Sequence, residues 1–577
     1  MLQNQTFKFI FVQLRKYWLE TLAGTVLLIA TNAIWYFITI KINGTVDLLV
    51  KNKIGLSNSF WWALGIIGVA ALLMAFIRTS SRIVLFGIGR QVESDQRTAF
   101  YNHLLKLDLL YFNTQKIGDL ISRSTSDIQA IRQMMGFGIL NIINIVWVYA
   151  FTLPLMLKLN AQITFWILIG YLPILAFVRY LSLKLKTDQQ LAQEKLGALS
   201  SFIEEDINGI QVIKAYSQEE REIERFKIIN DSYLNTATSL AQWRGLIWPI
   251  MEFAGRISFF VLVFYINQGK ISAGQIAAFL LCLERLVFPT AIIGWLITIF
   301  QRGSVSVQRI QEVFQENPQI KEIPQAKALK VDKGEIEIKD LSFKYEAKSD
   351  NILQNLSLKL EPKQFIGVVG LIGSGKSTLC SALLRLIDIP ENCIFIDGQD
   401  ITKISIGSLR EQISLIPQET FLFNSTISDN IGFAGNYTQA EIESAAKLAQ
   451  IHPEIINFKE AYQTMVGEKG VSVSGGQAQR IALARALITK PKVLILDDSI
   501  ASVDNEIGLQ ILNAVRQEFQ DLTLVLITHR ISSLKDADQI FVIDKGSCVG
   551  HGKHSNLLRH NIIYKKLWKK QKLASEI

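Results

Sequence analysis

Residues 370–377 read Gly-Leu-Ile-Gly-Ser-Gly-Lys-Ser, which fits the pattern G-x4-G-K-[ST]. The apolar run Phe365–Val369 before them predicts a buried strand, and a helical pattern follows. In such a loop, glycines let backbone N–H groups turn toward phosphate oxygens, and the start of the helix adds a positive dipole. A simple glycine-rich turn would explain Gly370 but not the Lys-Ser pair. The pattern therefore predicts a nucleotide site in which Lys376 reaches the β- and γ-phosphates and Ser377 binds Mg²⁺. The residues that we expect to contact the nucleotide here are Gly370, Gly373, Ser374, Gly375, Lys376, Ser377 and Thr378.

Two more predicted strands end in residues suited to nucleotide chemistry. Val493–Leu496 runs into Asp497 and Asp498, and Leu524–Thr528 ends at His529. Because open α/β sheets bind ligands at the carboxyl ends of parallel strands, we expect these side chains to meet the phosphate loop. A carboxylate such as that of Asp497 would hold Mg²⁺. A histidine at a strand end is more often structural, but its position here favours a functional role.

The composition of the whole chain indicates a membrane protein. Of the 577 residues, 49% are hydrophobic and 19% are charged, and the mean hydropathy is +0.25. The net charge of +9 is explained by Lys and Arg on cytoplasmic loops, so we predict no nucleic-acid partner. Four widely spaced cysteines, with no C-x-x-C pair, favour neither a disulfide framework nor a zinc site.

Residues 1–301 are predicted to form an all-α transmembrane domain with six helices and long cytoplasmic extensions. Each apolar segment is about long enough to cross a ~30 Å hydrocarbon core. The six segments are Thr21–Ile40, Phe60–Ile77, Gln133–Leu157, Leu159–Val178, Gly245–Gln268 and Ile271–Phe300. The long loops are rich in Lys and Arg, whereas the linkers at Lys158 and Lys270 are short, which places the long loops and both termini in the cytoplasm. We therefore expect a multi-pass protein of the cell (plasma or inner) membrane.

The character of the chain changes after the sixth span. Residues 302–333 form a predicted polar linker with Pro318 and Pro324, and residues 334–577 alternate short apolar strands with helical stretches. The predicted fold class is a membrane all-α six-helix domain followed by an α/β P-loop nucleotide-binding domain, which we expect in the cytoplasm.

Val473-Ser-Gly-Gly-Gln477 resembles the signature sequence of the ATP-binding cassette family. Residues 370–377, 493–498 and 501–504 and His529 resemble the other motifs of that family in the same order. Six spans followed by one cassette resemble a bacterial half-transporter of the exporter class over essentially the whole chain. The resemblance implies ATP and Mg²⁺ as cofactors and an adenine-stacking role for Tyr345. It also implies that Gln418 senses the γ-phosphate and that Ser377, Gln418 and Asp497 surround the metal.

The resemblance further implies that two cassettes close head to tail around two ATP molecules. Signature residues would then contact ATP held by the partner chain, for which a hydroxyl, small residues and a helix start are suited. These residues are Ser474, Gly475, Gly476 and Gln477. The cytoplasmic tips near Tyr111–Leu120 and Gly209–Tyr216 would couple cassette closure to the spans, although solvated loops remain the alternative for both.

One position departs from the family's pattern. Asp498 stands where the family usually has a Glu that orients the attacking water. Its carboxylate lies about 1.5 Å farther back, and misplacement on that scale can cost ~100-fold in rate. Residues 499–504 also deviate, whereas 473–477 and His529 are intact. We therefore assign catalytic positions to Asp498, His529 and Gln418, but predict weak hydrolysis at this chain's own site. The chain then resembles one half of a heterodimeric exporter, whose partner supplies the glutamate.

The predicted function is ATP-driven export of a hydrophobic or amphipathic compound, such as a drug, lipid or peptide, by a protein in contact with membrane lipids. Two alternatives remain: a slow homodimeric lipid flippase, and a regulatory or sensory membrane ATPase whose cassette gates a partner. Four charged residues in the last two spans fall at matching depths if the chain turns near Gly269, and they are Glu252, Arg256, Glu284 and Arg285. They would form interhelical ion pairs or line a substrate cavity.

Overall fold

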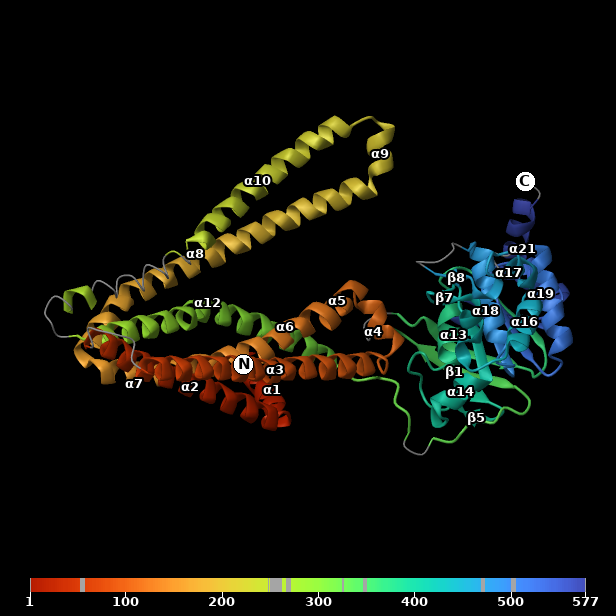
Figure 1. Ribbon diagram of the computed structural model, residues 1–577. Coiled ribbons are helices and arrows are strands. Elements are labelled where there is room, and N and C mark those ends of the chain that lie inside the picture. The colour runs from red at the N-terminus through yellow and green to blue at the C-terminus, as the bar shows by residue number, and fades with distance from the viewer. Residues whose placement is uncertain are drawn as a thin grey trace. The chain divides into compact units, whose positions relative to one another are not determined.

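The computed structural model describes residues 2–51, 58–246, 249, 262–265, 271–323, 326–345, 350–467, 473–499 and 505–575. The chain divides into two compact units (Figure 1). The first comprises Met1–Leu105 and Ile117–Glu316, and the second comprises Lys106–Lys116 and Asn317–Ile577. The short segment Lys106–Lys116 thus belongs to the second unit, although it lies in sequence between helices of the first.

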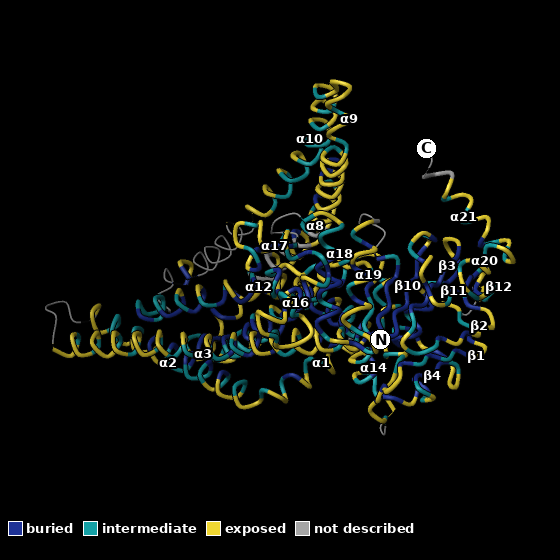
Figure 2. Tube along the Cα trace, turned by 90° about the vertical axis from the view of Figure 1, so that its right-hand side faces the viewer, coloured by how far each residue is buried: buried dark blue, intermediate teal, exposed yellow. Residues whose placement is uncertain are grey.

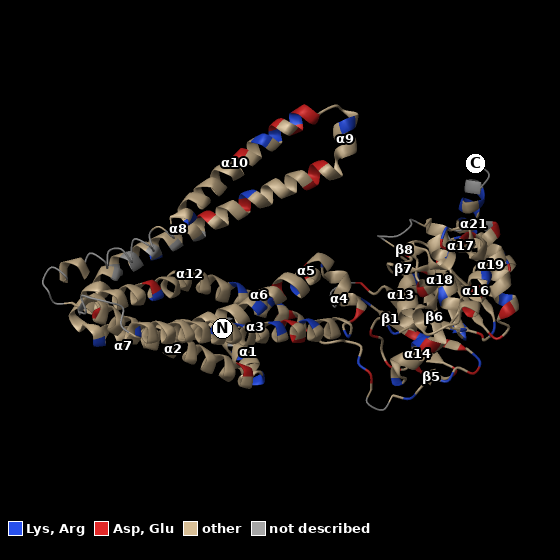
Figure 3. Cartoon of the chain, in the orientation of Figure 1, with Lys and Arg blue, Asp and Glu red and all other residues tan. Residues whose placement is uncertain are grey.

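The first unit is helical in all of its regular elements that the structure describes. Its long helices are α2 (Trp18–Lys51), α3 (Asn58–Leu104), α7 (Ile139–Leu159), α8 (Ala161–Asn208), α10 (Glu219–Gly245) and α12 (Ala273–Gln315). Its shorter helices are α1 (Leu2–Lys16), α5 (Ile117–Ser122), α6 (Ile128–Gln133) and α9 (Ile210–Ala215), with π-helical turns at Arg123–Asp127 and Met134–Gly138. Charged residues are sparse along α2 and α7 and gather near α9 and the neighbouring end of α10 (Figure 3).

Four continuous helical segments of the described chain are long and apolar enough to cross a membrane: Trp18–Val50, Asn58–Leu104, Ile117–Leu159 and Ala273–Gln315. They contain the predicted first, second and third spans, and the sixth except for Ile271 and Ser272. The predicted fourth span falls almost entirely in α8, whose first residues Ala161–Gly170 are apolar. Most of the predicted fifth span, with Glu252 and Arg256, lies outside the described residues. α12 continues to Gln315, so the predicted linker begins as helix rather than as an extended connector.

Close helix packing in the first unit depends on small residues. A Cβ on Gly89 of α3 would lie 2.9 Å from the Cα of Gly136, so these backbones approach too closely for a larger side chain. Asp47, in the last turns of α2, accepts hydrogen bonds from Ser272 Oγ at 2.9 Å and from Gly274 N at 2.8 Å. These bonds join the end of α2 to the start of α12. These contacts fix the ends and the middle of the helical bundle.

The second unit is built on a six-stranded sheet of order β12-β11-β3-β10-β9-β6, parallel except for β12. Its strands are β3 (Phe365–Gly370), β6 (Ile413–Ile416), β9 (Val493–Asp497), β10 (Thr523–Ile527), β11 (Gln539–Asp544) and β12 (Ser547–Gly552). Alternate residues of β3 enter two hydrophobic cores: Phe365 and Val369 join one, and Ile366 and Val368 join the other. The sheet is therefore covered on both faces, which explains its nearly continuous apolar strands.

Two smaller sheets and several helices complete the second unit. The antiparallel sheet of order β2-β1-β4-β5 comprises β1 (Ile336–Phe343), β2 (Leu353–Leu360), β4 (Ile394–Ile396) and β5 (Gln399–Asp400), and β7 (Ser425–Thr426) pairs with β8 (Met465–Val466). The helices are α4 (Leu109–Thr114), α13 (Lys376–Leu383), α14 (Ile406–Gln412), α15 (Ile427–Ile431), α16 (Gln439–Leu448), α17 (His452–Ile456), α18 (Gly475–Leu487), α19 (Asn505–Glu518), α20 (His554–His560) and α21 (Ile562–Ser575).

Candidate nucleotide site

The predicted phosphate loop connects β3 to α13. Gly373 and Gly375 have φ values of 80° and 97°, a left-handed conformation that glycine adopts without steric cost. A Cβ on Gly370 would lie 2.3 Å from the carbonyl oxygen of Ile543, so only glycine fits at the end of β3. The turn therefore needs its glycines, and it carries the chain directly from a buried strand to the start of a helix, where backbone N–H groups are free to bind an anion.

Lys376 is held beside this loop. Its Nζ donates hydrogen bonds to the carbonyl oxygens of Gly370 at 3.0 Å and of Leu371 at 2.8 Å. Burial lowers the pKa of the Lys376 ammonium, and the charges of Asp497 and Asp498 act in the opposite direction. A cation next to backbone donors suits the phosphates of a nucleotide, so the residues present fit the predicted ATP.

Strand register brings the predicted site residues to one edge of the sheet. Ile527 of β10 is paired with Val368 of β3 on one side and with Asp497 of β9 on the other. Because these strands are parallel, Gly370, Asp497 and Thr528 all lie at their carboxyl ends. The arrangement that the sequence predicted for these three strands is therefore present.

Ser377 and Asp497 provide oxygen atoms for a divalent cation. Burial raises the pKa of the Asp497 carboxyl, and a hydrogen bond with Ser377 opposes that rise. A hydroxyl and a carboxylate are hard ligands that fit Mg²⁺, and such sites keep several waters and take the remaining ligands from phosphates. Gln418, the third predicted ligand, is exposed and follows β6, the strand next to β9.

Asp498 has contacts of a different kind. Thr528 Oγ1 donates to its Oδ1 at 3.0 Å, and His529 Nδ1 lies 2.7 Å from its Oδ2, so both carboxylate oxygens bind groups at the end of β10. A carboxylate only accepts hydrogen bonds, so Nδ1 of His529 carries the proton. The backbone of Asp498 adopts φ of 49°, which is uncommon for a residue other than glycine. The neighbouring Ser499 Oγ is buried and has no hydrogen-bond partner in the part of the chain that the structure describes, and residues 501–504 lie outside it.

Tyr345 lies near the start of α13. Its hydroxyl is 3.2 Å from Thr378 Oγ1, and its ring makes an edge contact with Phe343 at 5.1 Å between centroids. The side chain remains 41% exposed, which leaves ring surface available for stacking. Tyr345 is thus held against the first turn of the helix that follows the phosphate loop.

The signature sequence forms the exposed start of α18. Ser474 caps the helix: its Oγ accepts from Gln477 N at 3.2 Å, and Gln477 Oε1 accepts from Ser474 N at 2.9 Å. Glu454 of α17 holds Gln477 at 2.8 Å and Arg480 at 2.6 Å. A Cβ on Gly475 would meet nothing within 4 Å. Val473 packs against the core, whereas Ser474 and Gly475 form an exposed, capped helix start.

The two predicted coupling tips differ. α4 belongs to the second unit, where Leu110 packs against the core that includes Ile366 and Val368. α9, by contrast, has no buried residue and is mostly exposed (Figure 2), with Val212 at 61% exposure, followed by Tyr216 at 73%. The tip at α4 therefore packs against an apolar core, whereas the tip at α9 remains exposed to solvent.

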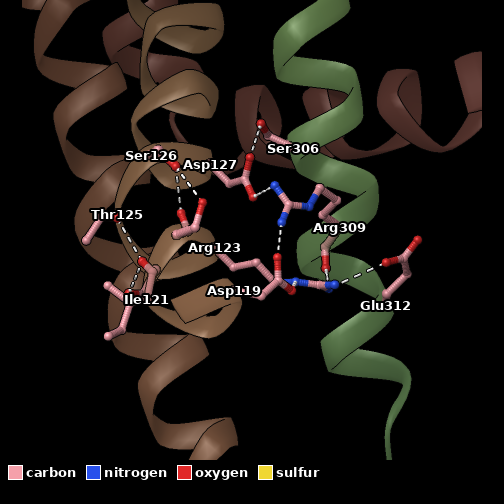
Figure 4. Close-up of polar contacts among 11 residues, drawn as sticks. Asp119, Ile121, Arg123, Thr125, Ser126, Asp127, Ser306, Arg309 and Glu312 are labelled. Atoms are coloured by element: carbon pink, nitrogen blue, oxygen red, sulfur yellow. Dashed lines mark hydrogen bonds and ion pairs between the residues drawn. The ribbon is translucent and has the colours of Figure 1, made fainter. Parts of the chain in front are cut away.

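A charged network joins the π-helical turn after α5 to α12 (Figure 4). Arg123 Nε donates to Asp119 at 2.7 Å, and Arg309 binds both Asp119 and, at 2.8 Å, Asp127. Ser306 Oγ donates to the other oxygen of Asp127 at 2.7 Å. No sequence pattern predicts this network, because its two halves are far apart in the chain. It links the helix that begins at Ile117 to the helix that ends just before Asn317, and the chain passes between the units at both of these places as well as after Leu105.

Comparisons with known proteins follow the same division. Residues 21–290 match the family described as the ABC transporter transmembrane region, and residues 353–501 match the family described as ABC transporter. The chain is 30% identical over 579 aligned residues to the multidrug resistance-like ATP-binding protein MdlA of Buchnera aphidicola subsp. Schizaphis graminum, covering 98% of this chain and 99% of the relative. The chain belongs to the ABC transporter family.

Two further comparisons also match nearly the whole chain to transporters. The chain is 31% identical to an ATP-dependent lipid A-core flippase of Syntrophus aciditrophicus, over 86% of this chain and 84% of the relative. It is similar to the solved structure of a bacterial Atm1-family ABC exporter with ATP bound, with a TM-score of 0.76, 25% identity and coverage of 97% and 98% of the two chains. The chain is thus an ABC exporter, and its second unit is an ABC transporter ATPase domain following a multi-pass transmembrane domain.

Proposed function

We propose that this chain is one half of a dimeric ABC exporter that uses ATP to move a hydrophobic or amphipathic drug, lipid or peptide out of the cell. One observation carries the proposal: the same chain combines a phosphate loop at the carboxyl edge of a sheet, an exposed signature helix and helices long enough to span a membrane. Relatives described as a multidrug resistance-like protein and as a lipid flippase support export over a purely regulatory role.

In this proposal the residues at the sheet edge hold ATP and Mg²⁺. The phosphate loop and Lys376 bind the phosphates, Tyr345 stacks on the adenine, and Ser377, Asp497 and Gln418 surround Mg²⁺. The metal would neutralise charge on the phosphates and orient them. Asp498, Gln418 and His529 are positioned around the water that attacks the γ-phosphate.

Dimerisation is supported by two exposed features. The start of α18 offers an anion site that nothing in its own unit covers at Gly475. α9 presents apolar side chains to solvent, whereas the half-buried Leu110 of α4 packs against the core of its own cassette. In a dimer, the partner's cassette would bind the exposed apolar side chains of α9, and the ATP that it holds would contact the start of α18.

We further propose that the partner is a different half-transporter. Asp498 is one methylene shorter than the family's usual glutamate, and both of its oxygens bind Thr528 and His529. This chain's own site would then hydrolyse ATP slowly, and its signature would complete a faster site on a partner that carries the glutamate. A slow homodimer is the competing assembly.

We propose three regions along the chain, oriented in the membrane as the positive-inside bias predicts. Residues 1–301 would form the transmembrane domain, 302–333 the connection and 334–577 the cassette, with the cassette and both termini in the cytoplasm of a cell whose plasma or inner membrane holds the protein.

Two experiments test this function. Affinity purification of the tagged chain from its own membranes should recover a second ABC half-transporter in equal amount; recovery of this chain alone supports the homodimer. The purified assembly, placed in liposomes, should move a fluorescent NBD-labelled phospholipid when ATP is added, and a Lys376→Ala variant should not. ATP turnover that no amphipathic compound stimulates, with no movement of the probe, would contradict export and favour a regulatory ATPase.

A further inference from the structure

A cavity of about 360 Å³ lies among α2, α3, α7 and α12. We propose that this cavity binds the anionic head of an amphipathic substrate, with the arginines around it as the ligands of that head. The inference rests on the export function proposed above and specifies the chemistry of its cargo.

The cavity has an excess of positive charge. Three arginines line it, Arg78 and Arg82 of α3 and Arg285 of α12, against a single carboxylate, that of Glu284. None of the three arginines forms an ion pair with any residue that the structure describes. Arg78 lies close enough to Arg82 and to Arg285 for their like charges to repel. Such an arrangement is costly in a membrane, and an anion between the arginines would relieve that cost.

Arg285 is oriented by two contacts and has a donor left over. Its Nη2 donates to Asn32 Oδ1 at 3.1 Å, and its guanidinium lies over the ring of Trp35, 5.3 Å from the centroid. Its Nε is buried and makes no hydrogen bond within the described part of the chain. A buried donor without a partner is unfavourable, so this geometry also points to an acceptor that a ligand would supply.

The remaining walls suit an apolar body. Trp35, Met74, Val148 and Phe288 line the same cavity. Its volume is within the range for small-molecule pockets, which combine apolar walls with a few polar groups that fix the orientation of the ligand. Asn141, whose Nδ2 donates to Phe137 O at 2.8 Å, and Asn144 add polar groups to the lining. A phosphate, carboxylate or sulfonate head joined to an apolar chain therefore matches the cavity.

The depth of the site indicates how such a molecule would enter. Arg285 lies about 18 Å along α12 from its first residue, and Arg78 about 30 Å along α3. If both helices begin at the outer surface, as the positive-inside bias predicts, the arginines lie in the inner half of the membrane. An amphipathic anion in the inner leaflet would reach them with its head at this level.

The test uses three probes with the same dodecyl chain and different heads: dodecyl phosphate, dodecyl maltoside and dodecyltrimethylammonium. We expect saturable binding of radiolabelled dodecyl phosphate to the full-length assembly in nanodiscs, with little competition from the neutral or cationic probe. Arg78→Gln and Arg285→Gln should each weaken this binding about tenfold or more. Arg285→Lys should retain part of it, and Arg90→Gln, an exposed arginine of α3 outside the cavity, should bind as the unchanged protein does. Arg285 also contacts Asn32 and Trp35, so loss of binding in Arg285→Gln could reflect altered packing. Arg78→Gln is the second variant, because it tests the same site without removing those contacts.

The outcomes separate this inference from the function on which it rests. Equal competition by the neutral or cationic probe, or unchanged binding by both Arg78→Gln and Arg285→Gln, would overturn the anion site even if ATP-driven export were demonstrated. Inorganic phosphate binding as tightly as dodecyl phosphate would overturn the amphipathic part, because the apolar walls would then contribute nothing. Binding is measured without ATP, so loss of transport with intact, arginine-dependent binding would count against the export proposal alone.

Discussion

His529 and Asp498 are hydrogen-bonded to each other where β10 and β9 end, with His529 Nδ1 2.7 Å from Asp498 Oδ2. Thr528 binds the other carboxylate oxygen, so the side chain that we propose replaces the family's catalytic glutamate is held by residues at the end of the neighbouring strand. A glutamate on the same backbone would carry its carboxylate about one C–C bond, ~1.5 Å, farther. The slow hydrolysis that we propose for this site thus has a geometric cause: the Asp498 side chain is short, and both of its oxygens are bound by neighbouring residues.

Removal of His529 should have little effect on a heterodimeric assembly. If this chain's own site contributes little turnover, His529→Ala should lower the steady-state ATPase rate of the assembly less than about threefold. The matched control is the equivalent histidine of the partner, whose removal should cost about 100-fold because it serves the fast site. A loss of that size in this chain's variant would show that its own site is the productive one.

The signature should be far more sensitive. A carboxylate at the start of α18 would oppose the phosphates of the partner's ATP, so Gly475→Asp should lower the assembly's ATPase rate about tenfold or more. A Cβ at this position has open space, and Gly475→Ala is therefore the control for folding and should retain most of the activity. Full activity in Gly475→Asp would mean that α18 does not face a nucleotide.

The network around Arg309 should stabilise the first unit. Arg309→Ala leaves Asp127, whose side chain is 10% exposed, without its cation, at a cost of about 2 kcal/mol. We expect the thermal unfolding temperature of the purified protein to fall by a few degrees and substrate-stimulated ATP turnover to weaken more than basal turnover. Arg225→Ala removes an exposed pair with Glu222 and should cost no more than about 0.5 kcal/mol. Equal shifts in both variants would contradict a stabilising role for the network.

Stability should fall in mild acid through His554. Burial and the charge of Lys535 lower the pKa of His554 below its ordinary value of 6.5, and its Nδ1 lies 2.7 Å from the hydroxyl of Tyr564. Because the unfolded chain binds the proton more readily, this contribution is present above about pH 6.5 and is lost as the pH falls toward the lowered folded value. Full-length His554→Gln should therefore lose less thermal stability than the unchanged protein between about pH 7.5 and pH 5.5. The same loss in both proteins would remove His554 as the cause.

Local sequence predicted the strand ends that carry the proposed nucleotide site. The phosphate loop, Asp497 and His529 each follow an apolar strand, and parallel strands place their carboxyl ends together, so chain position alone brought them to one edge. The roles of Gln418 and Tyr345 are inferred from the resemblance to the family. The structure shows which residues lie near them but does not show these roles. The partners of Asp498 were missed, although Thr528 stands next to His529, because hydrogen bonds between strand ends depend on register.

Features formed by distant segments could not be read from the sequence. Arg309 and Asp119 are 190 positions apart, and no periodicity links them. The inclusion of Lys106–Lys116 in the second unit depends on tertiary packing of Leu110. The three arginines of the cavity come from two helices, and of these the sequence marks only Arg285 as an intramembrane charge. Glu252 and Arg256, which the sequence places at the depths of Arg285 and Glu284 respectively, lie outside the described residues.

The most direct test of the proposed asymmetry is the Mg²⁺-dependent ATPase rate of this chain purified alone and with its partner, each with and without Asp498→Glu. We predict that the chain alone is nearly silent, that Asp498→Glu raises its rate about tenfold or more, and that the complete assembly is active and changes only modestly. A lone chain that forms a fully active dimer, with a rate that Asp498→Glu does not increase, would contradict the weak site and the need for a different partner.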